Sequence, residues 1–130
     1  DTVQAAVFCP KSTRWFRRTH ILPVRKMLDA GIRVALGTDS LASNDSLNFL
    51  EEIRMADKLL PDVSRKEILM MATRFGGEIL HLPCGIMETG KKADIIGFRI
   101  TTQGEDWYDL PFDPQYQNVD FYMVDGKIRA

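Results

Sequence analysis

Two short apolar runs, each followed by a helical pattern, divide the first half of the chain. Residues 5–9 read AAVFC and residues 32–36 read IRVAL. Short apolar runs of this kind are typical of strands that are buried on both faces of a parallel sheet. Val24, Met27 and Leu28 then recur at helical spacing, and a second helical pattern follows the second run. The alternation of strands and helices predicts an α/β protein with a parallel sheet.

Prolines and glycines set the expected limits of these elements. Pro10 ends the first strand, and residues 11–19 are expected to form a polar, basic loop. Pro23 suits the first turn of a helix that Gly31 ends. A loop is therefore expected between the first strand and the first helix.

The helix after the second strand has one apolar stripe and otherwise polar faces. Asp45 or Ser46 is a suitable N-cap for this helix. Glu51 and Glu52 are expected on its surface, where Glu51 near the first turn favours the helix dipole. The apolar stripe consists of Leu47, Leu50, Ile53 and Leu60.

A third helical pattern begins at a capping box. Ser64 and Glu67 stand three positions apart, a spacing at which each side chain can bond a free backbone N–H of the other residue. The pair Gly76 and Gly77 is expected to loosen the helical pattern before residues 78–81.

Short strands are expected in the last third of the chain. Residues 93–100 and 119–124 show the clearest strand patterns. Asp125-Gly126 is a strong signal for a tight turn, and residues 127–129 would form the returning strand. Residues 101–118 are long and rich in proline and aromatic residues, so we expect this segment to pack against the rest of the molecule.

Composition excludes several classes of protein. The chain has 130 residues, of which 45% are apolar, and a formal charge of −1, which argues against sequence-independent nucleic-acid binding. No apolar run is long enough for a membrane span. Without a secretory leader, a cytoplasmic location is the expectation. Cys9 and Cys84 have no metal-ligand spacing, so buried thiols are expected rather than a disulfide or a zinc finger.

Asp39 is the main candidate for chemistry. It stands in the segment VALGTDS, just beyond the carboxyl end of the second apolar run. In parallel α/β barrels, catalytic groups gather at these strand ends because the loops there converge on one mouth. An aspartate at that point can bind a metal ion or take a proton from metal-bound water. The spacing is also that of a turn former or helix cap, so both interpretations remain open.

Residues 12–18, STRWFRR, are a second candidate because they follow the first strand and would lie at the same mouth. The arginines of this segment could pair with a carboxylate or phosphate, and Trp15 or Phe16 could stack on a ring. Arg14 and Trp15 are the candidate substrate contacts among them. Ser12, in the same segment, is also a candidate substrate contact. The alternative is a solvated cluster of charges above one packed aromatic side chain.

Several other polar residues have weaker claims to a functional role. Ser40, Ser43 and Asn44 could orient the neighbouring carboxylate or contact a substrate, and helix capping explains Ser43 and Asn44 about as well. His20 and His81, the two histidines, are expected to be ordinary surface or packing residues.

Longer segments resemble a known family. VALGTDSLASN and the following DSLNFLEEIRMA are similar to the last barrel strand, loop and helix of the amidohydrolase superfamily, in its branch of deaminases and chlorohydrolases. AVFCPKS resembles the preceding strand, and ATRFGGEILHL resembles the closing helix. METGKKADIIGF and VDFYMVDGKIR resemble strands of the β-sandwich that flanks the barrel. The resemblance covers nearly the whole chain.

The resemblance implies that this chain is the C-terminal part of a metal-dependent hydrolase (β/α)8 barrel plus strands of a flanking β-sandwich. Residues 1–82 would be C-terminal strand–helix units of the TIM barrel, and residues 83–130 part of a composite β-sandwich domain. A complete barrel takes roughly 250 residues. The chain opens without Met and reaches a strand at once, so we expect it to begin inside a larger fold, with the N-terminal barrel portion upstream.

The chemistry implied by the resemblance is hydrolysis of a C–N bond other than a peptide bond. Asp39 would lie close to a single Zn²⁺ or Fe²⁺ ion and carry the proton of the activated water to the leaving ammonia. The other ligands in this family are histidines of earlier strands, so the isolated chain is expected to be inactive and to bind metal weakly. The expected substrate is a heterocyclic amine of the purine or modified nucleoside type, such as aminofutalosine, adenosine or S-adenosylhomocysteine. The family often has Asn where this chain has Thr13, so a contact made by that Asn is not carried over.

Two other functions remain open. The chain could be a non-catalytic binding or scaffolding module built on the same part of a barrel. It could also be a subunit that completes its barrel with another chain. Unpaired edges of parallel strands predict self-association in either case.

Overall fold

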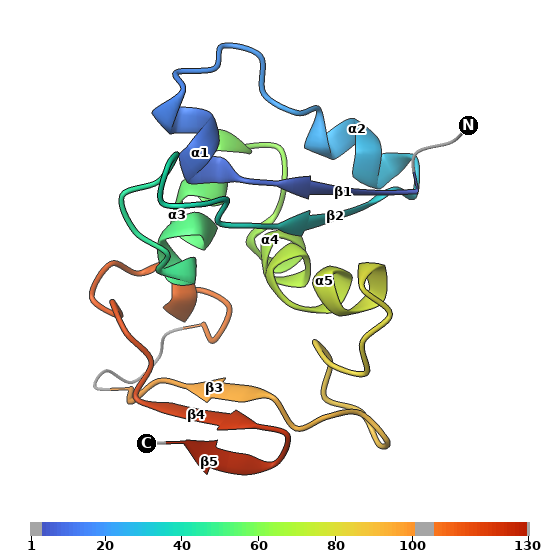
Figure 1. Cartoon of the computed structure of the whole chain (residues 1–130), viewed down its shortest axis with the longest axis vertical. Helices are drawn as coiled ribbons and strands as arrows, with labels where there is room; N and C mark the ends of the chain where they lie inside the picture. Colours follow the sequence, from blue (N-terminus) through green and yellow to red (C-terminus); the bar gives the residue numbers. More distant parts are fainter. Residues whose placement is uncertain (1–3, 101–105, 130) are drawn as a thin grey trace.

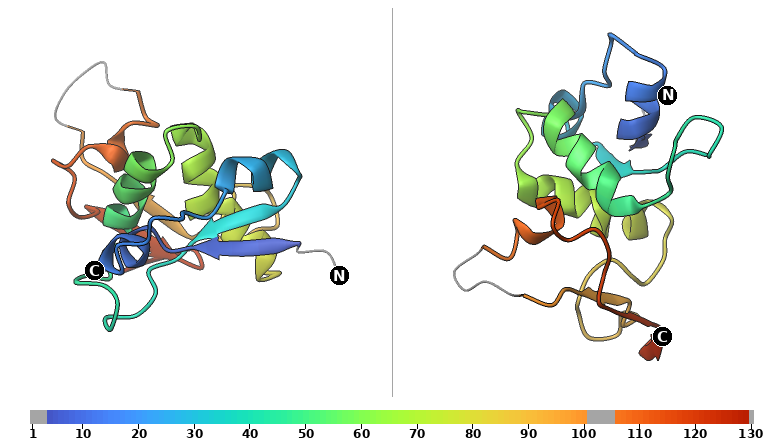
Figure 2. Two further views of the ribbon diagram at one scale, coloured as in Figure 1. Left: turned by 90° about the horizontal axis from the view of Figure 1, so that it is seen from above. Right: turned by 90° about the vertical axis from the view of Figure 1, so that its left-hand side faces the viewer.

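Two small sheets and five α-helices make up the computed structural model, which describes residues 4–100 and 106–129. In the first sheet, β1 (Ala5–Phe8) and β2 (Arg33–Leu36) run parallel, with Phe8 opposite Leu36. Figure 1 shows α3, α4 and α5 between this sheet and the second sheet, and the right-hand view of Figure 2 shows the same separation. The parallel pairing confirms the predicted α/β class.

Helices connect and cover the parallel strands. α1 (Pro10–Trp15) follows β1 directly, and α2 (Val24–Asp29) leads into β2. After β2 come α3 (Phe49–Leu59), α4 (Arg65–Ala72) and α5 (Arg74–Ile79). None of the helices in the described parts of the chain is long and apolar enough to cross a membrane.

The C-terminal region forms an antiparallel sheet in the order β3 (Ile95–Gly97), β4 (Phe121–Val124) and β5 (Lys127–Arg129). Asp125 and Gly126 join β4 to β5 with φ values of 52° and 72°. Positive φ at both central residues is what a two-residue Asp-Gly hairpin turn requires. The predicted hairpin is confirmed, although β3 and β4 are shorter than expected.

The main core lies between the parallel strands and the helices. Phe8, Val34 and Leu36 turn toward the helices and are buried, whereas Val7 is 58% exposed. The expectation that residues 5–9 are buried on both faces is therefore wrong for the structure described. The buried apolar residues of this core are Phe8, Val24, Val34, Leu36, Leu50, Ile53, Ala56, Leu60, Val63, Ile68, Met71 and Phe112.

Residues 10–15 form a helix where a loop was predicted. Pro10 occupies the first turn of α1, where its missing N–H costs nothing because that group would have no partner inside the helix. The predicted loop 11–19 is therefore wrong for its first half. As a consequence, the candidate residues Ser12, Arg14 and Trp15 lie on α1 and not in a loop.

The N-cap of α3 is Asn48, not Asp45 or Ser46. The side chain of Asn48 accepts a hydrogen bond from the N–H of Leu50 at 3.1 Å. The side chain of Asp45 instead forms an ion pair with Lys11 at 2.6 Å. The capping box of the next helix, Ser64 and Glu67, is present as predicted.

Glu52 is completely buried, which contradicts its predicted place on the surface of α3. Its two carboxylate oxygens accept hydrogen bonds from the side chain of Asn44 and from the N–H of Lys11. Both partners come from other segments of the chain, which the helical pattern of α3 alone does not reveal. Glu51, in contrast, is partly exposed as expected.

Residues 106–118 pack against α3. The sequence predicts such packing for the long segment 101–118. Both ends of the 3-10 helix η1 (Leu110–Phe112) are buried, and Tyr116 is buried beyond it. Arg54 of α3 donates a hydrogen bond to the carbonyl oxygen of Tyr116. Residues 101–105, the start of that segment, lie outside the described residues.

Candidate active site

The carboxyl ends of β1 and β2 meet at one edge of the first sheet, and Asp39 lies at this edge. Gly37 extends the pairing by donating its N–H to the carbonyl oxygen of Phe8 at 2.9 Å. Asp39 has a left-handed backbone conformation with φ of 58°, which aspartate adopts more readily than most residues. The carboxylate is thus exposed just beyond the end of β2.

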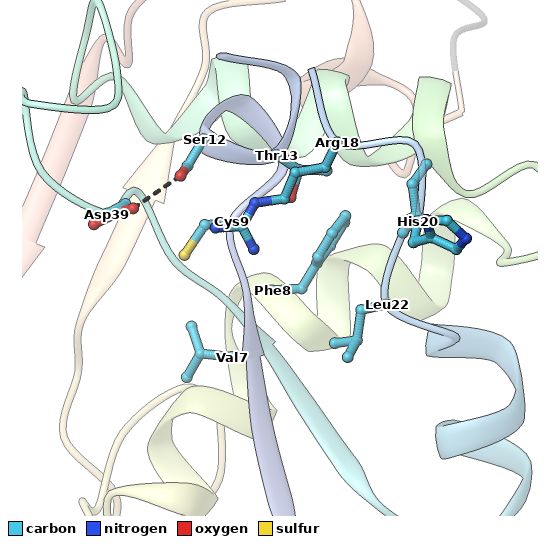
Figure 3. A pocket seen from close by; sticks show the side chains of 10 residues that line it. Val7, Phe8, Cys9, Ser12, Thr13, Arg18, His20, Leu22 and Asp39 are labelled. Atoms are coloured by element: carbon cyan, nitrogen blue, oxygen red, sulfur yellow. Dashed lines mark hydrogen bonds between the residues drawn. The ribbon is translucent and has the colours of Figure 1, made fainter. Parts of the chain in front are cut away.

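Both oxygens of the Asp39 carboxylate accept hydrogen bonds. The hydroxyl of Ser12 donates to Oδ2 at 2.8 Å (Figure 3). The backbone N–H of Ser40 donates to Oδ1 at 2.9 Å. The hydroxyls of Ser43 and Ser12, then the N–H of Ser40 and the charge of Arg18, lower the pKa of Asp39. Asp39 is therefore an anion at neutral pH that can accept a proton or bind a cation.

α1 separates the candidate residues 12–15 into two groups. Ser12, with 5% of its surface exposed, faces Asp39. Arg14 and Trp15 line a different hollow of about 220 Å³, together with Asn44. Of the four candidate substrate contacts, Ser12 and Ser40 therefore meet at Asp39, and Arg14 and Trp15 do not.

A cavity of about 390 Å³ opens beside Asp39. Arg18 and His20, from the segment between α1 and α2, line this cavity, and Figure 3 shows His20 on the opposite side from Asp39. The sequence predicts His20 to be an ordinary surface or packing residue, because it follows a basic segment and precedes a helix; the structure places it at the wall of this cavity. Arg18, rather than Arg14, is the arginine that shares the cavity with Asp39.

Cys9 lies between β1 and α1 and also lines this cavity. Burial, followed by the negative charges of Asp39 and Glu52, raises the pKa of the Cys9 thiol. A thiol that stays protonated is a poor nucleophile. Cys9 and Cys84 are both free cysteines, and the raised pKa argues against a nucleophilic role for the Cys9 thiol.

The described residues do not complete a metal site. A protein-bound zinc ion is held by about three or more His, Cys, Asp or Glu side chains. Among residues 4–100 and 106–129, no such group of three or more is gathered closely enough to hold a metal ion. Asp39 can supply one carboxylate ligand. The expectation that this chain alone binds metal weakly stays a prediction.

Comparison with known proteins gives consistent matches. The chain matches the model described as "Amidohydrolase family" over residues 3–129. It is 37% identical over 123 residues to the 5-methylthioadenosine/S-adenosylhomocysteine deaminase of Dictyoglomus thermophilum. It is 44% identical over 121 residues to the 5'-deoxyadenosine deaminase of Methanosarcina acetivorans. Each match covers 83% of this chain but only 28% of the relative.

A solved structure shares the fold. The crystal structure of an adenosine deaminase from Xanthomonas campestris with bound zinc is similar to this chain with a TM-score of 0.83. The match covers 95% of this chain and 31% of that chain, at 24% sequence identity. At this identity the likeness concerns the fold alone. Both kinds of comparison agree that this chain spans about a third or less of the length of the proteins it matches.

Proposed function

Because the chain belongs to the amidohydrolase family, we propose that it is the C-terminal part of a metal-dependent deaminase and that Asp39 is an active-site carboxylate. The curated relatives are named as deaminases of nucleosides. The observation that carries the proposal is the hydrogen bond between Asp39 and Ser12, which joins groups that follow two adjacent parallel strands.

The proposed architecture is a (β/α)8 barrel to which residues 1–82 contribute the last strand–helix units. In support, β1 and β2 pair in parallel, and their buried side chains face the helices. Val7 is largely exposed on the other face, where further strands of a barrel would enclose it. Residues 83–130 would belong to the composite β-sandwich. Unpaired strand edges would let the isolated chain self-associate.

In the proposed reaction, Asp39 carries a proton. Its lowered pKa keeps it ionised near neutral pH, so it can accept a proton from the water molecule that attacks the amine-bearing carbon of the substrate. It then delivers this proton to the departing ammonia, as a general base and acid in turn. Ser12 and Ser40 hold the carboxylate in place from two sides.

A divalent metal ion, zinc or iron, would activate the water in the complete enzyme. Asp39 would be one of its ligands, and the remaining ligands would come from residues other than those described. The cavity beside Asp39 would hold part of the substrate, with Arg18 and His20 at its wall. Contacts of Arg14 and Trp15 with substrate stay a prediction.

The substrate class is tested by measuring ammonia release. The complete protein that contains this sequence, loaded with zinc or iron, is incubated with 5'-deoxyadenosine, 5-methylthioadenosine, S-adenosylhomocysteine and guanine. We expect ammonia from at least one of the three adenine nucleosides. If a folded, metal-loaded protein releases no ammonia from any of these three nucleosides, the proposed function is wrong.

A further inference from the structure

Glu52 is a carboxylate of α3 with no exposed surface. A buried carboxylate is unfavourable unless hydrogen bonds or charges satisfy it. The side chain of Asn44 donates from Nδ2 to Oε1 of Glu52 at 2.6 Å, and the N–H of Lys11 donates to Oε2 at 2.9 Å. Glu52 therefore joins α3 to two segments that lie apart in the sequence.

The first of these segments is the loop that carries Asp39. Nδ2 of Asn44 also donates to the carbonyl oxygen of Thr38 at 2.9 Å, so both hydrogens of this amide group have acceptors. The carbonyl of Thr38 and the nitrogen of Asp39 belong to one planar peptide unit. By orienting Asn44, Glu52 therefore fixes the peptide plane that leads directly into Asp39.

The second segment is α1, which carries Ser12. The N–H of Lys11 lies in the first turn of this helix, where backbone donors have no partner within the helix. Cys9, the N-cap residue, provides no side-chain hydrogen bond. Glu52 accepts the N–H of Lys11 instead. The next residue, Ser12, then lies where its hydroxyl reaches Asp39 at 2.8 Å.

The positively charged side chain of Lys11, near Glu52, has other partners. The ammonium group of Lys11 pairs with Asp45 at 2.6 Å and with Glu51, both outside the buried site. Burial raises the pKa of Glu52, while the N–H of Lys11 and then the amide of Asn44 act in the opposite direction. Both oxygens of Glu52 face donors, an arrangement that a carboxylate satisfies and a carboxamide cannot.

We propose that Glu52 is a positioning residue for Asp39: one buried carboxylate holds both the loop that carries Asp39 and the helix that carries Ser12. The inference rests on the proposed function, because it assigns Glu52 a part in the reaction that Asp39 performs. Glu52 has no exposed surface toward the cavity, so it acts through Asn44 and α1 and not by touching the substrate.

The test is Glu52→Gln in the complete protein. The amide group of glutamine would face one of the two donors, so one of the two hydrogen bonds is lost. Displacement of Asp39 should lower kcat by about 10–100-fold. KM should stay within about threefold of wild type, because substrate binding is not removed. Hydrogen–deuterium exchange at residues 38–44 should become faster.

Glu51→Gln is the matched control. It changes the neighbouring residue in the same way and removes an ion pair with Lys11, but it leaves the bonds of Glu52 intact. Its kcat and its exchange at residues 38–44 should equal those of wild type. Should Glu52→Gln not fold, Asn44→Ser removes the same connection from the loop side and carries the same expectation.

The outcomes separate this inference from the proposed function. A folded Glu52→Gln protein with wild-type kcat and unchanged exchange at residues 38–44 overturns the positioning role. If the wild-type protein itself releases no ammonia, the proposed function fails. In that case the exchange measurement still decides whether Glu52 holds the loop, since it does not depend on turnover.

Discussion

Carboxylates of this chain differ in behaviour because their neighbours differ. Asp39 is exposed and accepts hydrogen bonds from Ser12 and Ser40. Glu52 is buried and connects segments of the chain. Glu67 belongs to the capping box of α4. The same functional group thus serves as a proposed proton carrier, a buried anchor and a helix cap.

The lowered pKa of Glu67 predicts how the free energy of unfolding depends on pH. The Ser64 hydroxyl, then Arg25 and the Ser64 N–H, lower the pKa of Glu67 from 4.5 to about 2. Because the folded state favours the ionised form, Glu67 stabilises the protein above about pH 4.5, and this stabilisation is lost as the pH falls toward 2. Replacing Glu67 by Gln should therefore cost about 1 kcal/mol or less at pH 7, since the site is partly exposed. The cost should decrease steadily below pH 4.5.

Urea denaturation between pH 7 and pH 3 measures this difference. Ser64→Thr is the control, because threonine keeps a capping hydroxyl, and its free energy of unfolding should follow the wild-type pH dependence. A constant difference between wild type and Glu67→Gln over the whole pH range would show that the ionised carboxylate is not the stabilising group.

At the scale of elements, α5 contains two adjacent glycines whose surroundings differ. The sequence predicts that this pair loosens the helix, yet α5 continues through both. A Cβ atom on Gly77 would lie 2.3 Å from the carbonyl oxygen of Cys84, whereas a Cβ on Gly76 would meet nothing within 4 Å. The backbone at Cys84 packs so closely against α5 that glycine is required at position 77 but not at position 76.

Alanine substitutions test this contrast. Gly77→Ala should lower the free energy of unfolding by about 1–3 kcal/mol, because the backbone at Cys84 must move. Gly76→Ala, in the same helix, should be neutral or stabilising by about 0.5–1 kcal/mol, because alanine favours the helix. Thermal unfolding of both variants measures the difference. Equal effects of the two substitutions would contradict the close approach at Gly77.

At the scale of the whole molecule, local signals were sufficient for much of the fold. The parallel strands follow from apolar runs, the start of α4 from the spacing of Ser64 and Glu67, and the last hairpin from Asp125-Gly126. In each case the residues that determine the structure are adjacent or a few positions apart. The division at residue 82 into barrel and sandwich portions stays a prediction.

The features that sequence reasoning missed depend on contacts between distant segments. Glu52 is buried because Lys11 and Asn44 satisfy it, and no helical pattern reports such partners. The α3 cap falls at Asn48, while Asp45 pairs with Lys11 from a distant segment. For the candidate site, the position of Asp39 was predictable from the strand before it. Its contact with Ser12 depends on α1, which was predicted as a loop.

The central claim is that the Asp39 carboxylate takes part in catalysis by a deaminase, and turnover of an Asp39→Asn variant tests it most directly. Ammonia release and bound metal are measured on the complete protein, with Asp45→Asn as a control from the same loop. Loss of the proton-carrying group should lower kcat by about 10²–10⁴-fold, while Asp45→Asn stays near wild type. An Asp39→Asn protein with wild-type turnover and wild-type metal content would contradict the account.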